Sequence, residues 1–206
     1  MQGEHSPKDP TPLVIVISGP SGVGKDATLA KIKESGVRFH CVVTATTRKR
    51  RASEINGADY YFLTQKEFET RIKQNEFLEY AKVYNNYYGV LKKEVCDALK
   101  QGEDIIIKVD VQGAKTLKNK MPEAVFIFLM PPSIEDLTDR LKARNADSQQ
   151  DVDLRMSQVE EEIKNLEMFD YMVINHKDSL DQTAETIKSI VVAEKCRVHR
   201  RVVHLK

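Results

Sequence analysis

The sequence has few cysteines and almost no net charge, and both shortages narrow the possible functions. Cys41, Cys96 and Cys196 are odd in number and far apart, which argues against a disulfide framework or a zinc site and fits a reducing compartment. The chain carries 32 Lys and Arg against 31 Asp and Glu, so overall charge gives no reason to expect nucleic acid or an anionic membrane as a partner. An anionic ligand would have to be held by local charge.

Long hydrophobic runs are missing as well. The longest, residues 13–17 and 125–130, are far shorter than the roughly 20 residues that span a bilayer, so they predict buried strands. Residues 1–12 lack both the apolar stretch of a signal peptide and the Arg-rich, acid-poor bias of a transit peptide. We therefore expect a location in the cytoplasm, or in the plastid or mitochondrial matrix if a transit peptide has been removed.

What the sequence does contain is an alternation of apolar strands and helices. Residues 13–17 form a continuous apolar run, which is typical of a parallel strand covered on both faces, and residues 25–34 then favour a helix. Alternating units of this kind predict an α/β fold with a parallel sheet, right-handed crossovers and helices on both faces. Further strands are expected at residues 39–43, 105–109, 125–130 and 171–174, and further helices at 91–101, from 133, and from 180.

Three segments depart from this alternation. Residues 44–88 are long, polar and rich in aromatics and turn signals, which predicts a small strand-containing insertion. Residues 145–153 are polar and predict a mobile lid between two helices. The basic end of the last helix, residues 195–201, is expected to be a solvated terminus, with a docking tail as the alternative.

A phosphate-binding loop follows the first strand. Residues 19–25, Gly-Pro-Ser-Gly-Val-Gly-Lys, satisfy G-x-x-x-x-G-K between a strand and a helix, as the mechanism requires. The glycines let successive N–H groups point at phosphate oxygens, the helix offers its positive N-terminus, and Lys25 reaches the β and γ phosphates. A plain turn needs neither three glycines nor a lysine. The residues expected at ATP are Gly19, Pro20, Ser21, Gly22, Val23, Gly24, Lys25, Asp26 and Ala27.

Four further motifs identify a resemblance. Residues 44–62, which contain Thr-Thr-Arg-Lys-Arg-Arg and Asn-Gly-Ala-Asp-Tyr, resemble the GMP-binding segment of guanylate kinases. Residues 75–80 (Asn-Glu-Phe-Leu-Glu-Tyr), 86–89 (Asn-Tyr-Tyr-Gly) and 109–113 (Val-Asp-Val-Gln-Gly) resemble three more motifs of the same family, in the same order. The runs Gly-Lys-Asp-Ala and Val-Val-Thr-Ala-Thr and the tail Ala-Glu-Lys-Cys-Arg-Val-His-Arg are most similar to the plant organellar branch.

The resemblance implies a fold and an activity. The fold would be that of P-loop NTPases, a three-layer α/β/α arrangement, and the reaction would transfer a phosphoryl group from ATP to GMP, and also to dGMP, with Mg²⁺ as cofactor. The expected partners are only these small molecules, and the expected assembly is a monomer or weak dimer. The expected divisions are a flexible segment 1–12, a nucleotide-binding core 13–43, 91–134 and 156–206, a GMP-binding subdomain 44–90, and a lid 135–155.

Two arginines three residues apart are the expected clamp for the GMP phosphate. Arg48 and Arg51 offer planar forks that bind phosphate bidentately, and the resemblance adds Tyr60 and Tyr88 as hydroxyl donors to the same oxygens. The alternative for this basic run is a solvated patch, which is the interpretation adopted for Lys49 and Arg50.

Guanine presents two neighbouring donors, N1–H and the exocyclic amine, which one carboxylate can accept. By family position this carboxylate is Glu79, with Asp110 assisting and the Thr44 hydroxyl also touching the base. Val90 replaces a serine that many members have, which puts one guanine hydrogen bond in doubt.

The resemblance also supplies groups for the donor side. Arg144 and Arg155 are spaced as the family's donor-phosphate arginines are, and with Lys25 and Arg48 they form the expected catalytic set. Arg140, one turn before Arg144, has a surface ion pair as its alternative. Asn175 resembles the family residue near adenine.

Two departures bear on magnesium. Asp26 stands where a Ser or Thr usually ligates the ion, and Lys108 stands where many members have Asp. One hypothesis is that Asp26 holds the hydrated metal while Lys108 pairs with Asp26 or with a phosphate. The alternative is a structural ion pair remote from the metal.

A catalytically inactive guanylate-kinase-like binding module is the alternative function. Such modules typically lose the P-loop lysine and the lid arginines, whereas Lys25, Arg144 and Arg155 are all present, so the sequence favours the enzyme.

Overall fold

The computed structural model describes residues 11–36, 38–83, 85–142, 149–176 and 178–205, and the side chains of 141, 142 and 149–155 are outside this description. Its centre is a parallel sheet in the order β2-β7-β1-β8-β9. Ile15 of β1 lies opposite Ile106 of β7 and Val125 of β8, so the hydrophobic strands predicted from the sequence pair directly. The strands are β1 (Val14–Ser18), β2 (His40–Cys41), β7 (Ile105–Lys108), β8 (Val125–Met130) and β9 (Tyr171–Ile174).

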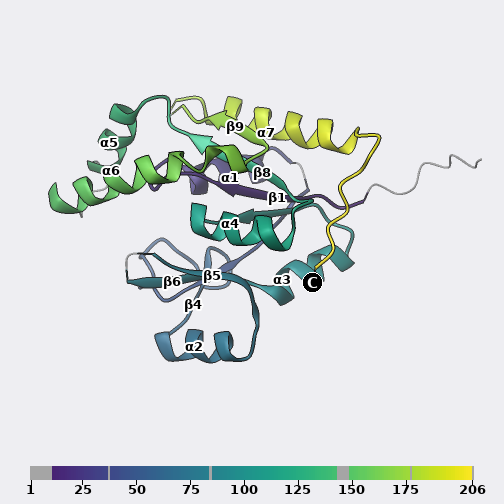
Figure 1. The fold of residues 1–206 in the computed structure, drawn as a ribbon, viewed down its shortest axis with the longest axis horizontal. Coiled ribbons are helices and arrows are strands. Elements are labelled where there is room, and N and C mark those ends of the chain that lie inside the picture. Colours follow the sequence, from purple (N-terminus) through teal and green to yellow (C-terminus); the bar gives the residue numbers. More distant parts are fainter. Residues whose placement is uncertain (1–10, 37, 84, 143–148, 177, 206) are drawn as a thin grey trace, which may run out of the picture.

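Successive residues of β1 point to opposite faces of this sheet, and each face has its own core. Val14 and Val16 pack with residues of α3 (Lys92–Lys100) and α4 (Val111–Lys120), whereas Ile15 and Ile17 pack with α1 (Lys25–Glu34) and α7 (Leu180–Lys195). Figure 1 shows α7 and α4 on opposite sides of the strands. The expected three-layer α/β/α arrangement is confirmed.

The insertion forms a second sheet, in the order β4-β3-β6-β5. Its strands are β3 (Thr44–Thr46), β4 (Tyr60–Phe62), β5 (Phe77–Val83) and β6 (Asn86–Leu91). The helix α2 (Gln65–Lys73), which was not predicted, covers this sheet, and its Phe68 stacks on Phe77 with ring centres 4.3 Å apart. The start of α2 is fixed by a capping box in which Thr64 and Glu67 each bind the other's backbone N–H.

Two helices flank residues 143–148, which lie outside the described residues. Ser133 accepts a hydrogen bond from the Asp136 N–H at 3.1 Å and so caps α5 (Ile134–Lys142), as predicted. The predicted lid segment 145–153 is helical from Gln149 onward, because α6 spans Gln149–Ile163. Leu137 of α5 and Val159 of α6 are fully buried together, and a short 3-10 helix, η1 (Leu166–Met168), follows α6.

The basic C-terminal end departs from the expectation at one residue, because residues 195–200 are exposed, as predicted, whereas Arg201 is partly buried. Arg201 is not solvated, because its guanidinium binds the buried Glu194 carboxylate at 2.9 Å and the Ala124 carbonyl at 3.3 Å. Val203 and Leu205 then pack against the core on the α4 face, which brings the C-terminal segment next to α3 (Figure 1). Among the described helices, none is both long and apolar enough to cross a membrane.

Candidate nucleotide-binding and catalytic site

A pocket of about 300 Å³ lies where the carboxyl ends of β1 and β7 face the second sheet. Ligands of open α/β sheets generally bind at this end of the strands. The structure therefore brings together groups predicted from distant parts of the sequence. The predicted residues that line the pocket are Gly19, Ser21, Gly22, Gly24, Lys25, Asp26, Thr44, Arg48, Arg51, Tyr60, Glu79, Tyr88 and Asp110.

The P-loop adopts backbone angles that need glycine. Gly22 and Gly24 have φ of 84° and 101°, in the left-handed region, and Gly24 leads directly into α1. Lys25 bends back over the loop, and its ammonium donates to the Gly19 carbonyl at 2.5 Å and to the Pro20 carbonyl at 3.1 Å. Burial lowers the pKa of Lys25, and the nearby carboxylates oppose that effect.

A network behind the P-loop holds it in this shape. The Asn175 amide donates to the Val23 carbonyl at 2.7 Å and accepts from the Thr183 hydroxyl at 3.0 Å. Arg140 donates to the Val23 carbonyl at 3.2 Å and to the Asn175 carbonyl at 3.0 Å, while pairing with Asp136. Arg140 is thus more than a surface ion pair. Asn175 lies behind the loop and outside the pocket lining, so its expected contact with adenine stays a prediction.

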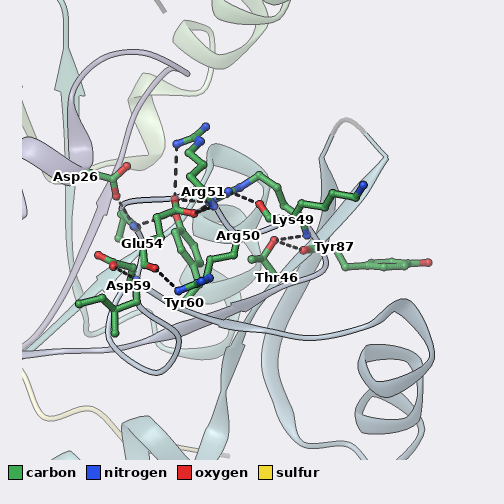
Figure 2. Close-up of polar contacts among 12 residues, drawn as sticks. Asp26, Thr46, Lys49, Arg50, Arg51, Glu54, Asp59, Tyr60 and Tyr87 are labelled. Carbon is green, nitrogen blue, oxygen red and sulfur yellow. Dashed lines mark hydrogen bonds and ion pairs between the residues drawn. The ribbon is translucent and has the colours of Figure 1, made fainter. Parts of the chain in front are cut away.

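On the second sheet, Arg48 is held by a carboxylate from its own loop. Its two terminal nitrogens bind the two oxygens of Glu54 at 3.0 and 2.7 Å, and Glu54 also accepts from the Arg51 backbone N–H at 2.7 Å. Figure 2 shows Arg51 beside the Glu54 carboxylate. Hydrogen bonding by Arg48 lowers the pKa of Glu54 below its ordinary value.

The Asn-Gly-Ala-Asp turn places Tyr60 beside this arginine. Asn56 accepts from the Phe62 N–H at 2.9 Å, Asp59 accepts from the Ile55 N–H at 2.7 Å, and Gly57 has φ of 80°. The Arg48 guanidinium lies 5.4 Å from the Tyr60 ring centre, and the Tyr88 ring packs edge-on to Tyr60 at 6.2 Å. The predicted phosphate clamp is therefore assembled in one place.

Glu79 is a buried carboxylate that faces this pocket. It is 3% exposed, and its Oε2 has no hydrogen-bond partner among the described residues. Burial, followed by the nearby Asp110, raises the pKa of Glu79 to about 8. Gly113 makes room for the carboxylate, since a Cβ there would lie 2.9 Å from Oε2. An acceptor this deeply buried fits a ligand that presents donors.

The comparisons with known proteins agree with this site. A model of the guanylate kinase family matches residues 11–194. The chain belongs to the guanylate kinase family. Members of this family act on ATP and GMP, so the enzyme is favoured over the inactive binding module.

Individual relatives extend the match over nearly the whole chain. The chain is 44% identical over 197 residues to "Guanylate kinase 2, chloroplastic/mitochondrial" of Oryza sativa subsp. japonica, covering 95% of this chain and 69% of that one. It is 43% identical to the guanylate kinase of Caldanaerobacter subterraneus subsp. tengcongensis, covering 91% and 90%. The crystal structure of guanylate kinase from Anaplasma phagocytophilum superposes with a TM-score of 0.75 at 31% identity, covering 94% and 92%. The rice relative bears out the resemblance to the plant organellar branch.

The structure shows where two residues that depart from the usual guanylate kinase pattern lie. Val90 is fully buried in the hydrophobic core and does not line the pocket. Lys108 does line it, and it pairs with Asp26, so the pair expected from the sequence is present. Burial alone would lower the pKa of Lys108, but Asp26 and Tyr60 outweigh burial and raise it.

Asp110 occupies the junction between the donor and acceptor sides. It caps α4 by accepting the Gly113 N–H at 2.8 Å, and it is close enough to Lys25 and Glu79 to influence the pKa of both. Thr44, on β3, is 4% exposed and also lines the pocket.

Glu162 is a pocket residue that sequence reasoning missed. It lies on α6, and its carboxylate is close enough to the Ser21 backbone in the P-loop for that backbone to influence its pKa. Its Oε2 is buried with no hydrogen-bond partner among the described residues. Burial and Asp110 raise the pKa of Glu162, while Lys25 opposes them. No sequence signal distinguishes it from its exposed neighbours Glu160 and Glu161.

Some predicted residues lie elsewhere. Arg144 is outside the described residues, and Arg155 lies on α6 with its side chain outside the description. Pro20, Val23 and Ala27 do not line the pocket. The Pro20 carbonyl accepts from Lys25 within the loop, the Val23 carbonyl accepts from Asn175 and Arg140 behind it, and Ala27 is exposed on α1.

The donor set fits magnesium that arrives with a nucleotide. Among the described residues there is no group of three His, Cys, Asp or Glu side chains that could enclose a metal. Asp26 follows the P-loop lysine and is 66% exposed at its side chain. Magnesium is usually held by one or two carboxylates, phosphate oxygens and water, so a single carboxylate here is adequate.

Proposed function

We propose that this pocket binds ATP at the P-loop and GMP on the second sheet, and that the γ-phosphoryl passes directly between them without a covalent enzyme intermediate. The observation that carries this proposal is the buried Glu79 carboxylate in the same pocket as Lys25 and Arg48. A buried carboxylate without a hydrogen-bond partner suits an acceptor nucleotide that carries neighbouring donors, as guanine does. Phosphoryl transfer then needs positioning and charge rather than a strong base.

On the acceptor side, Arg48, Arg51, Tyr60 and Tyr88 would hold the GMP phosphate. Arg48 has the bidentate geometry this role requires, because it already binds both oxygens of Glu54. Glu79 would accept from the guanine N1–H and amine, with Thr44 and Asp110 assisting. None of these contacts involves the ribose 2′-hydroxyl, so dGMP is proposed as a second acceptor.

On the donor side, the P-loop amides and Lys25 would bind the ATP phosphates, and Arg144 and Arg155 are proposed to neutralise the transferring group. Asn175 and Arg140 would act from behind, by fixing the Val23 carbonyl. Magnesium bound with ATP would supply further positive charge, and Asp26 is the residue that would hold it, through water.

The location of the chain is also a proposal. The rice relative is named chloroplastic/mitochondrial, which supports an organellar matrix, with the cytoplasm as the alternative.

A coupled assay of ADP release tests the function. We expect release that requires both ATP and GMP, with AMP a poor acceptor, and we expect Glu79→Gln to raise the GMP KM sharply while barely changing that for ATP. Equal use of AMP and GMP by the wild-type chain would contradict the role of Glu79.

The proposed role of Asp26 in holding magnesium is tested by a separate set of variants. Asp26→Ser should weaken magnesium-dependent turnover, and adding Lys108→Asp should restore much of it by recreating the common arrangement of the family. An unchanged magnesium dependence in Asp26→Ser would remove Asp26 from the proposed metal site.

A further inference from the structure

Lys108 lies between the two nucleotide sites and contacts both. It ends β7 and lies opposite Ile17 of the parallel strand β1, so its side chain leaves the sheet beside the start of the P-loop. Its Nζ donates to the Asp26 carboxylate on the first turn of α1 and to the Tyr60 hydroxyl at 3.0 Å. The side chain is only 15% exposed.

We propose that Lys108 is a positioning residue, which anchors Tyr60 to the first turn of the P-loop helix and directs the Tyr60 hydroxyl proton toward the GMP phosphate. This inference rests on the proposed function, because it assumes that the GMP phosphate binds at Arg48, Arg51 and Tyr60.

The direction of the proton follows from what each group can donate. A lysine ammonium has three donors and no acceptor, so the Tyr60 oxygen must accept from Lys108. The hydroxyl's own proton therefore points away from Lys108, and a phosphate oxygen is the acceptor it would meet in this pocket. A positive charge at the hydroxyl oxygen also strengthens that hydroxyl as a donor.

The tyrosine ring is held as well as its hydroxyl. The Lys108 ammonium lies 4.4 Å from the Tyr60 ring centre, and Arg48 lies 5.4 Å from it. Since Asp26 belongs to the helix that begins at the P-loop, the chain Asp26, Lys108, Tyr60 fixes the acceptor clamp relative to the donor phosphates. Members of the family with Asp at position 108 would lack this link.

The experiment is a double-mutant cycle on Lys108 and Tyr60, with Lys108→Met, Tyr60→Phe and the double variant. GMP and ATP KM values, kcat, and GMP affinity by calorimetry are measured for each. Lys108→Met should raise the GMP KM about tenfold and shift the ATP KM less than about twofold, because coupling between contacting groups is commonly worth a factor of this size. In the Tyr60→Phe background the same change should add less than about twofold.

Further variants separate the competing roles. Lys108→Gln keeps an amide donor for Tyr60 and should recover part of the GMP affinity; it also replaces Lys108→Met in the cycle if that variant does not fold. Lys115→Met, at an exposed lysine of α4 outside the pocket lining, is the matched control.

The possible outcomes are distinct. If the effects of Lys108→Met and Tyr60→Phe multiply, Lys108 acts on the substrate itself and the proposal is overturned. If Asp26→Asn restores the GMP KM of Lys108→Met, Lys108 only neutralises Asp26, and the proposal is again overturned. If the wild-type chain shows no GMP-dependent ADP release, the proposed function fails instead.

Discussion

In its proposed role as the guanine acceptor, Glu79 has to satisfy opposite requirements in the free and the GMP-bound protein. Burial and Asp110 favour its protonated form and raise its pKa to about 8, whereas the two guanine donors require the ionised form. Folding and guanine binding therefore act on the same proton in opposite directions.

The first prediction concerns stability against pH. The folded-state pKa of Glu79 lies above its unfolded value, so the folded chain binds the extra proton and loses stability as pH rises from about 4.5 to about 8. Glu79→Gln should remove this loss, so the variant should gain stability relative to wild type as pH rises from about 4.5 to about 8 in urea unfolding experiments. Parallel stability curves for the two proteins would show that the pKa of Glu79 is not raised.

Arg48 is predicted to be poorly replaced by lysine. Its fork makes two parallel bonds and lies against the Tyr60 ring, and an ammonium can reproduce neither feature. Arg48→Lys should raise the GMP KM by about tenfold or more, while Arg50→Lys, at an exposed neighbour, should change it little. Steady-state kinetics at saturating ATP provide the measurement. Equal GMP KM values for the two variants would mean that the basic run is a solvated patch and does not bind the GMP phosphate.

At the scale of elements, the junction between β7 and α4 shapes the proposed guanine site. Asp110 caps α4, and Gly113 in its first turn leaves the space that the Glu79 carboxylate fills. Backbone packing thus sets the position of a side chain from another strand, β5.

Gly113→Ala is therefore predicted to impair guanine binding. The added Cβ would lie 2.9 Å from Glu79 Oε2 and 3.1 Å from the Val109 Cβ, so the carboxylate has to move. The GMP KM should rise several-fold while the ATP KM stays unchanged. Gly102→Ala is the control, because nothing lies within 4 Å of its added Cβ, although its positive φ makes a stability measurement necessary alongside. An unchanged GMP KM in Gly113→Ala would mean that guanine binding does not depend on the present position of the Glu79 carboxylate.

The elements differ in how far the sequence predicts them. The buried strands β1 and β8 follow from continuous apolar runs, and so does β9, although Met172 and Ile174 of β9 are exposed. The helix α1 follows from the P-loop that starts it. The helix α2 was not predicted because its residues 65–73 are mostly polar. The only sequence signal for it is the pair Thr64 and Glu67, which forms the capping box at its start. The sequence also did not predict that Glu162 lines the pocket or that Asn175 supports the P-loop. Both features depend on tertiary contacts with the P-loop, and nothing in the local sequence of either residue encodes those contacts.

At the scale of the whole molecule, the C-terminal segment fastens α7 to the central sheet. Arg201 joins Glu194 of α7 to Asp170, which precedes β9, and to the Ala124 carbonyl before β8. The Glu194 side chain is only 1% exposed, so it depends on these partners.

Arg201→Met should therefore lower the free energy of unfolding by about 2 kcal/mol, because a buried carboxylate loses its best charged partner. Arg197→Met, at a more exposed arginine 3.6 Å from the same carboxylate, should cost clearly less. Thermal and urea unfolding give both values, and kcat at saturating substrates should be unaffected. Equal losses in the two variants would contradict a specific role for Arg201.

Glu162 and Glu54 place carboxylates against the groups proposed to bind phosphate, one at the P-loop and one in the fork of Arg48. The protein thereby supplies its own counterions at both sites. A phosphate that binds therefore displaces a carboxylate of the protein, and it releases fewer ions from solution than it would at a cationic site without such carboxylates. Both nucleotides should consequently bind with a weaker dependence on ionic strength than the number of basic groups in the pocket would suggest.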